Sequence, residues 1–309
     1  MEQNTYATSI YIDSPVTAAT QYLTDGKSLD EYTLFSRMQK QVDEHTWLGT
    51  ASGYQNGLYY HVKEREVGAI KIVEWHCGPE LGKYFHVYPM MLFSPSYFAG
   101  DSKETGTYYH WISFVDPARR TPMIAQGLPI VHRSEARSLK AQLERRQGHD
   151  RPIAGALELA SHTIYVDAPL DTVAGYLSDR SKLTEWGYML RADGEFCRDA
   201  YDHPVEVTVT RHDLGAYQVI EHDTHYVKAG VVVRTPMVII PASYAFAAPN
   251  ATGVILHRIS AWPKIGERDH GKASPDDYDT EAINAKRIIE RIAGNLTAYD
   301  RGVSYRSGE

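Results

Sequence analysis

The stretch Thr163–Leu183, TIYVDAPLDTVAGYLSDRSKL, decides the fold, because a near-copy of it stands earlier in the chain. Residues 9–29 read SIYIDSPVTAATQYLTDGKSL, and at an offset of 154 the two stretches share 8 identities in 21 positions. Most of the remaining pairs are conservative, for example Ile12 with Val166. Self-similarity of this kind indicates an internal duplication.

The similarity continues along the chain. The offset is 147 over the middle of each copy and 146 near its end, so a gap of 7 residues is expected between about 33 and 60. A period near 150 is the size of one domain and exceeds the roughly 20–50 residues of a solenoid repeat. We therefore predict two domains, 1–147 and 158–309, joined by a linker at 148–157. Pairs at the later offsets include Glu74/Glu221, Pro89/Pro236, Tyr97/Tyr244, His110/His257, Ser113/Ser260 and Glu135/Glu281.

Composition and charge narrow the class of protein. With 43% hydrophobic residues, 23% charged residues and a net charge of −7, the chain is typical of a globular protein. Neither half is basic, and no Lys/Arg run is long enough to follow phosphates, so we expect no nucleic-acid partner. The N-terminus lacks a signal peptide pattern and no apolar stretch is long enough to span a membrane. Cys77 and Cys197 form no disulfide framework, so we expect a cytoplasmic protein.

Each copy begins with a short alternating strand that ends in Ser-Pro or Ala-Pro. Proline suits the first turn of a helix, and we expect Asp13 and Asp167 to cap the short helix that follows. β-Branched and aromatic residues then dominate, and glycine-containing turns separate them. We predict strands near 45–50, 57–66, 69–76, 83–93 and 105–115, and near 204–211, 216–226, 230–240 and 253–262.

Each copy ends in a helix. The second helix is the clearer one, because Ser274 offers an N-cap and is followed by Pro275 and two acidic residues. Apolar residues then recur at helical spacing, which predicts an amphipathic helix that packs on an apolar partner. The first copy repeats this stripe less strongly with Ala136, Leu139 and Leu143.

The order of strand, two short helices, antiparallel meander and long helix resembles the helix-grip fold of the START and birch-pollen-allergen-like superfamily. The segments IYIDSPVTAATQYLTD and IYVDAPLDTVAGYLSD carry the resemblance, which covers nearly the whole chain twice. It implies an α+β protein with two tandem helix-grip domains, each an antiparallel sheet curled around a long C-terminal helix. Two tandem copies are also similar to the di-domain polyketide aromatase/cyclases. Those enzymes usually carry a Trp-Pro pair where this chain has EYTLF and EWGYM, so no catalytic residue is carried over.

A helix-grip sheet encloses a pocket, and alternation along a strand suggests which residues face it. In 106–115 the face with His110 is the more apolar one, and the second copy has His257 in the same place. We therefore predict that these two histidines face the pocket. The residues predicted to line it and to bind substrate are Tyr108, Ile112, Ile255, Ile259 and Tyr217.

The same alternation places Glu74 and Glu221 on the apolar-leaning face of the preceding strands. We predict that His110 or His257 removes a proton next to a carbonyl and that the glutamate steadies the imidazolium. A third group, the hydroxyl of Tyr97 or Tyr244, would then donate a hydrogen bond to the developing enolate. The alternative is that the repeated histidines and glutamates are inherited structural residues or, for the glutamates, lie on the solvent face.

The resemblance to the polyketide aromatase/cyclases, together with the repeated histidine and glutamate, implies a cofactor-independent enzyme, similar to a cyclase, aromatase or dehydratase, that acts on a bulky carbonyl-bearing intermediate of secondary metabolism. We expect an apolar or aromatic small-molecule ligand, no cofactor and no metal, and a homodimer remains possible. A metal site around His212, His222 and His225 is a weaker alternative, because His222 and His225 point to opposite faces of a strand. The rival function is a non-catalytic carrier or receptor for an apolar molecule or lipid, and a third possibility is that one copy is degenerate.

Overall fold

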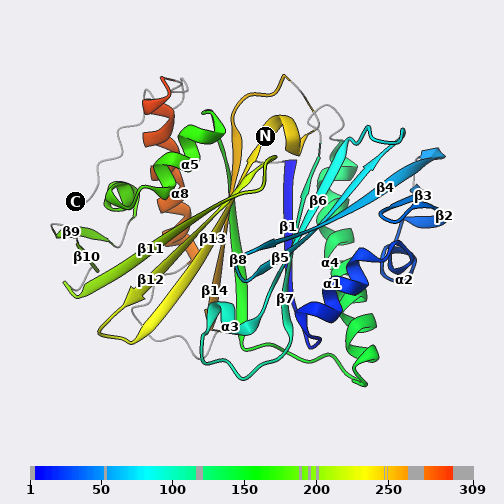
Figure 1. Ribbon diagram of the computed structural model, residues 1–309, viewed down its shortest axis with the longest axis horizontal. Helices are drawn as coiled ribbons and strands as arrows, with labels where there is room; N and C mark the ends of the chain where they lie inside the picture. The colour runs from blue at the N-terminus through cyan, green and yellow to red at the C-terminus, as the bar shows by residue number, and fades with distance from the viewer. Residues whose placement is uncertain are drawn as a thin grey trace. The chain divides into compact units, whose positions relative to one another are not determined.

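The chain of the computed structural model runs through one antiparallel sheet and a long helix and then repeats this arrangement (Figure 1). It forms two compact units, the first comprising Met1–Ser161, Ser243–Pro249 and Ser260–Arg268 and the second the remaining segments. In the described part of the chain, no helix is long and apolar enough to cross a membrane. The structure describes residues 4–51, 54–115, 121–187, 190–193, 196–199, 202–246, 248, 250–263 and 275–294.

The first sheet is antiparallel, and its strand order is β1-β7-β6-β5-β4-β3-β2. Strands β1 and β7, the first and last in sequence, lie side by side with Ser9 opposite His110. The strands are β1 (Thr5–Ile12), β2 (Arg37–Asp43), β3 (Thr46–Ala51), β4 (Tyr54–Val67), β5 (Ile70–Gly78), β6 (His86–Phe93) and β7 (Thr107–Phe114).

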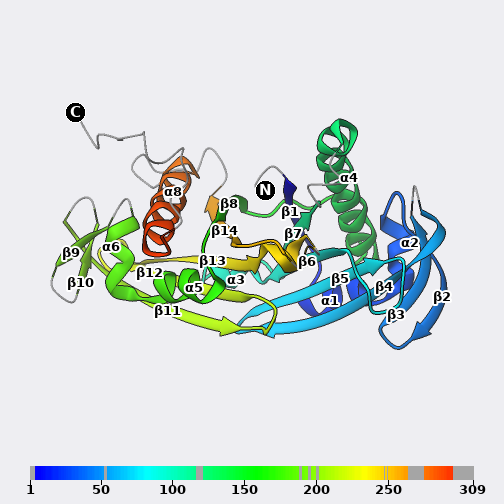
Figure 2. The same cartoon turned by 90° about the horizontal axis from the view of Figure 1, so that it is seen from above.

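One long helix covers a face of this sheet. Figure 2 shows the first sheet curving around the side on which α4 (Pro122–Arg146) lies. The stripe Ala136, Leu139 and Leu143 is buried there in one core with the sheet residues Tyr109 and Trp111, as apolar residues at helical spacing require. The shorter helices of this unit are α1 (Val16–Thr24), η2 (Gly26–Ser28), α2 (Leu29–Tyr32) and α3 (Pro95–Phe98).

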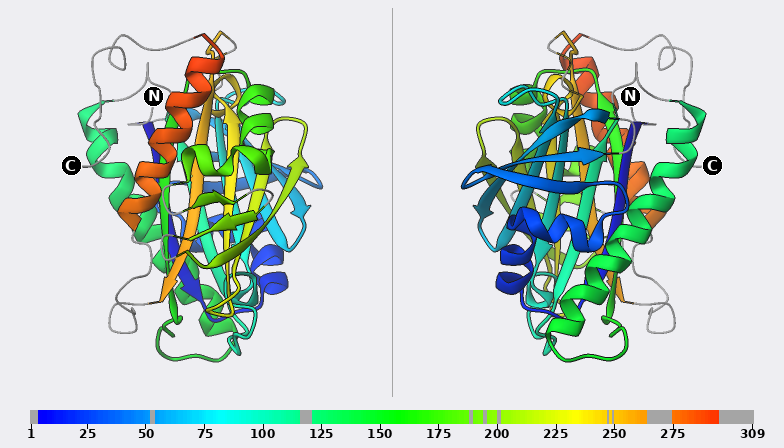
Figure 3. Two further views of the ribbon diagram at one scale, coloured as in Figure 1. Left: turned by 90° about the vertical axis from the view of Figure 1, so that its left-hand side faces the viewer. Right: turned by 90° about the vertical axis from the view of Figure 1, so that its right-hand side faces the viewer.

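The second sheet has the same topology, with strand order β8-β14-β13-β12-β11-β10-β9. Its helix α8 (Pro275–Ile292) contributes Ala282, Ala285 and Ile289 to the core. Figure 3 shows each long helix running obliquely over its own sheet, α8 in the left view and α4 in the right view. The other elements are β8 (Leu157–Val166), α5 (Leu170–Ser178), η4 (Arg180–Lys182), α6 (Leu183–Trp186), β9 (Arg191–Asp193), β10 (Phe196–Arg198), β11 (Pro204–Asp213), β12 (Gln218–Tyr226), β13 (Val231–Pro241), α7 (Ala242–Ala245) and β14 (Val254–Pro263).

The predicted fold, two helix-grip domains in tandem, is confirmed by this strand order and by the two long helices. The extra residues of the first copy lengthen the hairpin formed by β2 and β3, which β9 and β10 replace with shorter strands in the second copy. The predicted caps at Asp13 and Asp167 are wrong. The N-cap positions are Pro15 and Pro169, and no side chain caps α1 or α5. The predicted cap Ser274 lies outside the described residues.

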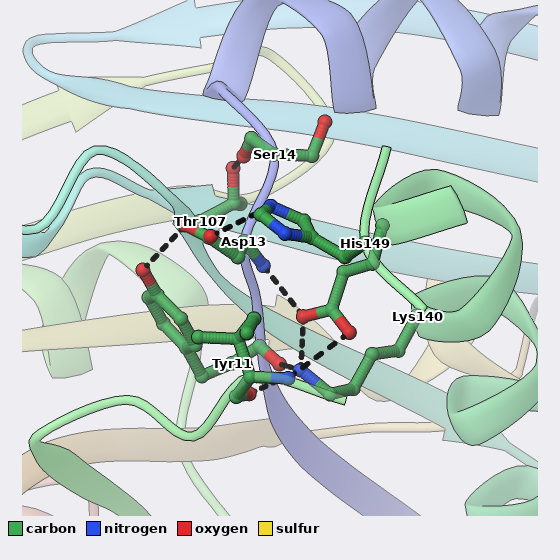
Figure 4. Close-up of polar contacts among 8 residues, drawn as sticks. Tyr11, Asp13, Ser14, Thr107, Lys140 and His149 are labelled. Atoms are coloured by element: carbon green, nitrogen blue, oxygen red, sulfur yellow. Dashed lines mark hydrogen bonds and ion pairs between the residues drawn. The ribbon is translucent and has the colours of Figure 1, made fainter. Parts of the chain in front are cut away.

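Asp13 instead takes part in a partly buried group of polar contacts that joins the end of β1 to α4, and its carboxylate lies 2.9 Å from His149 Nε2 (Figure 4). Glu144 accepts a hydrogen bond from the Asp13 amide at 2.9 Å and forms an ion pair with Lys140. The ammonium of Lys140 also donates to the carbonyl of Tyr11 at 2.7 Å and to that of Ile153 at 2.6 Å. The second copy repeats the pair with Lys286 and Glu290. The Ile, Tyr, Asp and Pro shared by residues 10–15 and 164–169 therefore have a structural role.

Candidate functional site

The face of the first sheet that packs against α4 carries the odd-numbered residues of β7. Tyr109 and Trp111 share one core with Ala136 and Leu139 of the helix. Because side chains alternate along a strand, His110 lies on the opposite face. The prediction that the histidine face is the helix-covered interior is therefore wrong, and the same holds for the neighbours Tyr108 and Ile112.

The second copy shows the same arrangement. Val254 and Leu256 pack with Ala282 of α8, so His257 lies on the face turned away from the helix. The predicted substrate-binding residues Ile255 and Ile259 share that face, and the buried Tyr217 lies just before β12 begins. The prediction failed because every residue of β7 is buried, and Ile255, His257 and Ile259 of β14 are also buried. Apolarity therefore does not distinguish the two faces.

Both predicted histidines contact a hydroxyl of the neighbouring strand. His110 Nδ1 lies 2.7 Å from Ser9 Oγ, and His257 Nδ1 lies 2.7 Å from Thr163 Oγ1. Complete burial lowers the pKa of His110 to about 3, because desolvation disfavours the imidazolium. A histidine that is neutral at every physiological pH and bonded across two strands has the environment of a structural residue.

The predicted glutamates lie beside other histidines. The buried carboxylate of Glu74 lies 3.0 Å from His76 Nε2 and accepts hydrogen bonds from Arg65 Nε at 3.1 Å and Tyr244 Oη at 3.3 Å. Tyr244 belongs to a segment of the first unit, and burial and this carboxylate raise its pKa. Strand β6 separates Glu74 on β5 from His110 on β7, a spacing of about 10 Å between the two strands.

The remaining predicted residues are also placed apart from the histidines with which they were grouped. Glu221 on β12 lies 2.9 Å from His212 Nε2 on β11. The buried ring of Tyr97 packs against Phe93 and Phe98, with ring centroids 5.1 and 4.8 Å away. The structure therefore does not assemble the predicted combination of histidine, glutamate and tyrosine as one site.

A different carboxyl group lies in the interior of the first unit. Glu135 projects from α4 one residue before Ala136 and is only 6% exposed. Burial raises the pKa of Glu135 to about 7, although the Leu34 amide, which donates to Oε1 at 2.7 Å, and the Arg37 charge both lower it. The group therefore exchanges its proton near neutral pH, as a general acid or base requires.

The charge of this carboxyl group acts on four buried tyrosine hydroxyls. Burial raises the pKa of Tyr32, Tyr60, Tyr88 and Tyr109, that of Tyr60 to about 12, and the charge of Glu135 raises each further. All four are therefore hydrogen-bond donors at neutral pH. The hydroxyls of Tyr32 and Tyr109 are buried and have no hydrogen-bond partner among the described residues. Buried polar groups in proteins are almost always partnered, so these two hydroxyls are candidates for contact with a ligand.

His132 lies one turn before Glu135 on α4. Its ring packs on Trp111 with centroids 4.1 Å apart, and its Nε2 lies 3.4 Å from Ser113 Oγ. Desolvation lowers the pKa of His132 to about 4, so the imidazole is neutral at pH 7. The remaining ring nitrogen, Nδ1, and the indole nitrogen of Trp111 are buried without a partner in the described part of the chain. We call Glu135, Tyr32, Tyr109 and His132 the interior cluster.

The second unit carries Glu281 at the position of Glu135. Its carboxylate forms an ion pair of 2.6 Å with Arg258, and both side chains are buried. The guanidinium of Arg258 lies 5.7 Å from the centroid of the Trp186 ring, which in turn packs on His222. Nε2 of His222 lies 2.9 Å from the carbonyl oxygen of Leu177. In this interior, opposite charges neutralise each other.

Sequence reasoning missed the interior cluster although one signal was present. Glu135 and Glu281 match at the offset of 146, and each precedes the first alanine of its apolar stripe. An acidic residue beside the buried stripe of a helix, repeated in both copies, marks a carboxyl group at the edge of a core. Among the described residues, no group of three or more His, Cys, Asp or Glu side chains could hold a metal ion. The raised pKa of Glu135 and the buried tyrosine hydroxyls enable the interior cluster to exchange protons and donate hydrogen bonds.

A separate groove of about 290 Å³ lies outside the interior, between α1, η2 and the C-terminal end of α4. Tyr22, Glu31 and Arg146 line it and already contact one another, since Arg146 pairs with Glu31 at 2.8 Å and covers the ring of Tyr22. The hydroxyl of Tyr22 donates to the same carboxylate at 2.9 Å. Tyr176 and Glu185 repeat this last contact in the second unit, so it stabilises the helix pair in each copy.

Comparison with known proteins identifies the family. The family model described as "Domain of unknown function (DUF8713)" matches residues 1–152 and again 159–298, and the chain belongs to this family. No curated protein matches the chain.

Solved structures with similarity over most of the chain include two proteins from biosynthetic loci. One is DynU16, a putative protein in the dynemicin biosynthetic locus (13% identity, 94% of this chain and 96% of that one, TM-score 0.30). Another is the di-domain ARO/CYC protein BexL (11% identity, 95% and 99%, TM-score 0.33). A START superfamily protein from Mycobacterium smegmatis matches 46% of this chain and 98% of its own at 8% identity and a TM-score of 0.31. The fold assignment rests on the strand order described above.

Proposed function

We propose that the interior of the first unit is a cofactor-independent acid–base site that acts on a largely apolar, carbonyl-bearing small molecule. One observation carries the proposal: the charge of the buried Glu135 carboxyl group acts on buried tyrosine hydroxyls, two of which have no partner among the described residues. An intermediate of the polyketide kind, with several carbonyl groups along an otherwise apolar chain, has the matching chemistry. Ring closure and loss of water from such a chain require proton transfer and positioning.

In this mechanism Glu135, ionised, removes a proton from the carbon next to a carbonyl group of the substrate. The hydroxyls of Tyr32 and Tyr109 donate hydrogen bonds to the oxygen on which negative charge develops. The enolate carbon then forms a carbon–carbon bond with a second carbonyl carbon of the same molecule, and the new alkoxide oxygen takes the proton from Glu135. The carboxylate is regenerated, so the step needs no cofactor and no redox partner.

The raised pKa of Glu135 suits both the removal of a proton from the substrate and its return to the product. A carboxyl group whose pKa is about 7 is a stronger base than an exposed glutamate and is still readily deprotonated at neutral pH. Proton transfer of this kind contributes about 10²–10⁴-fold to a rate. Holding the chain in a reactive conformation supplies up to about 7–11 kcal/mol more. Trp75, Met90 and Leu92 belong to the apolar core of the same unit, which keeps water away from this interior.

The test is exchange of the methyl protons of acetophenone and of acetonaphthone for deuterium in D₂O, followed by proton NMR. These ketones report proton abstraction alone and need no natural substrate. We expect the intact protein to catalyse exchange, and E135Q to lower the rate by about 10²–10⁴-fold. We expect Y32F and Y109F to lower the rate by smaller factors. Exchange that is undiminished in folded E135Q would refute the assignment.

H110F is the matched control. It removes the imidazole first predicted to be the base, but His110 lies on the face of β7 turned away from α4. We expect H110F to keep the exchange rate of the unmodified protein once circular dichroism shows that it is folded. If H110F abolished exchange and E135Q did not, the catalytic base would lie on the opposite face of the sheet.

A carrier is the second candidate function, and the unpartnered hydroxyls favour it as well, because they would bind a carbonyl oxygen without any reaction. The two functions differ in one result. A carrier binds acetonaphthone, measured by calorimetry, equally well in the unmodified protein and in E135Q, and it exchanges none of the ketone protons in either. Weaker binding in Y32F and Y109F would then locate the ligand in the interior cluster.

A further inference from the structure

The two copies differ at one strand position beside the repeated glutamate. In the first copy Trp111 of β7 lies opposite Met90 of β6, and in the second Arg258 of β14 lies opposite Met237 of β13. The register is the same, so the two side chains occupy equivalent places on the helix-facing side of each sheet. The first copy has an uncharged indole there, and the second has a permanently charged guanidinium.

This difference determines what surrounds each glutamate. The Trp111 ring packs on His132, and the charged group acting on Glu135 is Arg37, which also donates to the Thr33 carbonyl at the surface. In the second copy the Arg258 guanidinium reaches the Glu281 carboxylate at 2.6 Å.

The other partners of the first interior are replaced as well. At the offset of 147, Tyr60, Tyr88 and Tyr109 correspond to Val207, Thr235 and Leu256. At the offset of 154, Tyr32 corresponds to Trp186. All of the replacements are buried, so the second interior keeps its packing but has lost the phenol hydroxyls on which the charge of Glu135 acts. Both differences, the added counter-ion and the missing hydroxyl donors, make the second interior less suited to proton transfer than the first.

We propose that the residue at this strand position determines which copy can transfer a proton: Trp111 supplies no counter-ion to Glu135, and Arg258 pairs with the carboxylate of Glu281. The consequence for catalysis rests on the function proposed above. The first copy is then the reactive one, and the second is a folded copy whose interior does no acid–base chemistry. The physical basis is that a buried carboxylate without a counter-ion is costly, whereas one paired with arginine in good geometry is retained as the anion.

The experiment adds a positive charge at this strand position in the first copy and removes it in the second, both in the full-length protein. Glutamate labelled with ¹³C at its carboxyl carbon is titrated by NMR, and E135Q and E281Q assign the two signals. We expect the Glu135 signal of the unmodified protein to titrate near pH 7. In W111R, which places a guanidinium where the second copy has one, we expect this midpoint to move down by at least a full pH unit. W111F, which removes the indole and adds no charge, should keep it near pH 7.

R258M supplies the independent reverse test, because methionine fills similar volume without charge. In R258M we expect the midpoint of Glu281 to rise above the ordinary range of glutamate and to approach that of Glu135. A folded W111R in which Glu135 still titrates near pH 7 would overturn the inference. So would a folded R258M in which the Glu281 midpoint is unchanged. If W111R does not fold, the result for R258M decides.

The ketone exchange assay is then read separately. We expect W111R to lower the exchange rate by a smaller factor than E135Q, because an ion-paired carboxylate of lower pKa is a weaker base but is still present, and W111F to retain the rate. If the NMR midpoints move as expected but no variant, including the unmodified protein, exchanges ketone protons, the proposed function fails while the assignment of the charge states holds. The two failures are therefore distinguishable.

Discussion

Replacing Glu135 by glutamine should change how the stability of the first unit depends on pH. Burial raises the folded-state pKa of Glu135 to about 7 from the ordinary value of 4.5. The folded protein therefore holds this proton more tightly than the unfolded chain does. The stability contribution is fully present below about pH 4.5, and it is lost as the pH rises through about 7, where folding must bury an ionised carboxylate.

The size of the effect follows from the difference between the two values. At about 1.4 kcal/mol for each pH unit, the interval from 4.5 to about 7 corresponds to about 3 kcal/mol. Glutamine has a similar shape and no charge, so E135Q is insensitive to this titration. Relative to the unmodified protein, the variant should gain about 3 kcal/mol in free energy of unfolding between about pH 4.5 and pH 8.

Urea unfolding at several values between pH 4.5 and 8 measures this difference. Tryptophan fluorescence is a suitable signal, because three of the five tryptophans, Trp47, Trp75 and Trp111, lie in the first core. E66Q at an exposed position serves as the control for loss of a carboxyl group. If the stability difference between E135Q and the unmodified protein were the same at both ends of the pH range, Glu135 would not be a buried group of raised pKa.

Three further changes test other parts of the structure. K140M should destabilise the protein by about 3–5 kcal/mol in urea unfolding, because it leaves the carboxylate of Glu144 buried without its cation. The double variant K140M/E144Q should cost less than K140M alone, and a larger loss in the double variant would contradict the pairing. E281Q should lower the urea midpoint by a comparable amount, since it removes the carboxylate that neutralises Arg258. G78A should cost about 1–3 kcal/mol, because its Cβ would stand 2.0 Å from a backbone carbonyl oxygen of the following turn, and an unchanged midpoint would exclude this close approach.

Much of the architecture followed from the sequence because its signals are local. The repeated segments around Tyr11 and Tyr165 identified the duplication, and alternating residues bounded most of the strands. The short strands β9 and β10 and the exposed strand β2 were not predicted. β2 has no buried residue and β9 and β10 are three residues long, so their sequences carry little hydrophobic periodicity, and pairing with a neighbouring strand defines them.

What the sequence by itself determined was two copies of one fold and, through periodicity, which residues of a strand share a face. It did not determine which of the two faces meets the long helix. Both sides of β7 are buried, so the placement of His110 away from α4 and of Trp111 toward it became clear only when the sheet curved around the helix. The protonation of Glu135 was likewise decided by tertiary structure. The same residue type at the same helical position is a buried acid in the first copy and an ion-pair partner in the second. A residue more than 20 positions away in the sequence makes this difference, because Arg258 supplies a counter-ion and Trp111 does not.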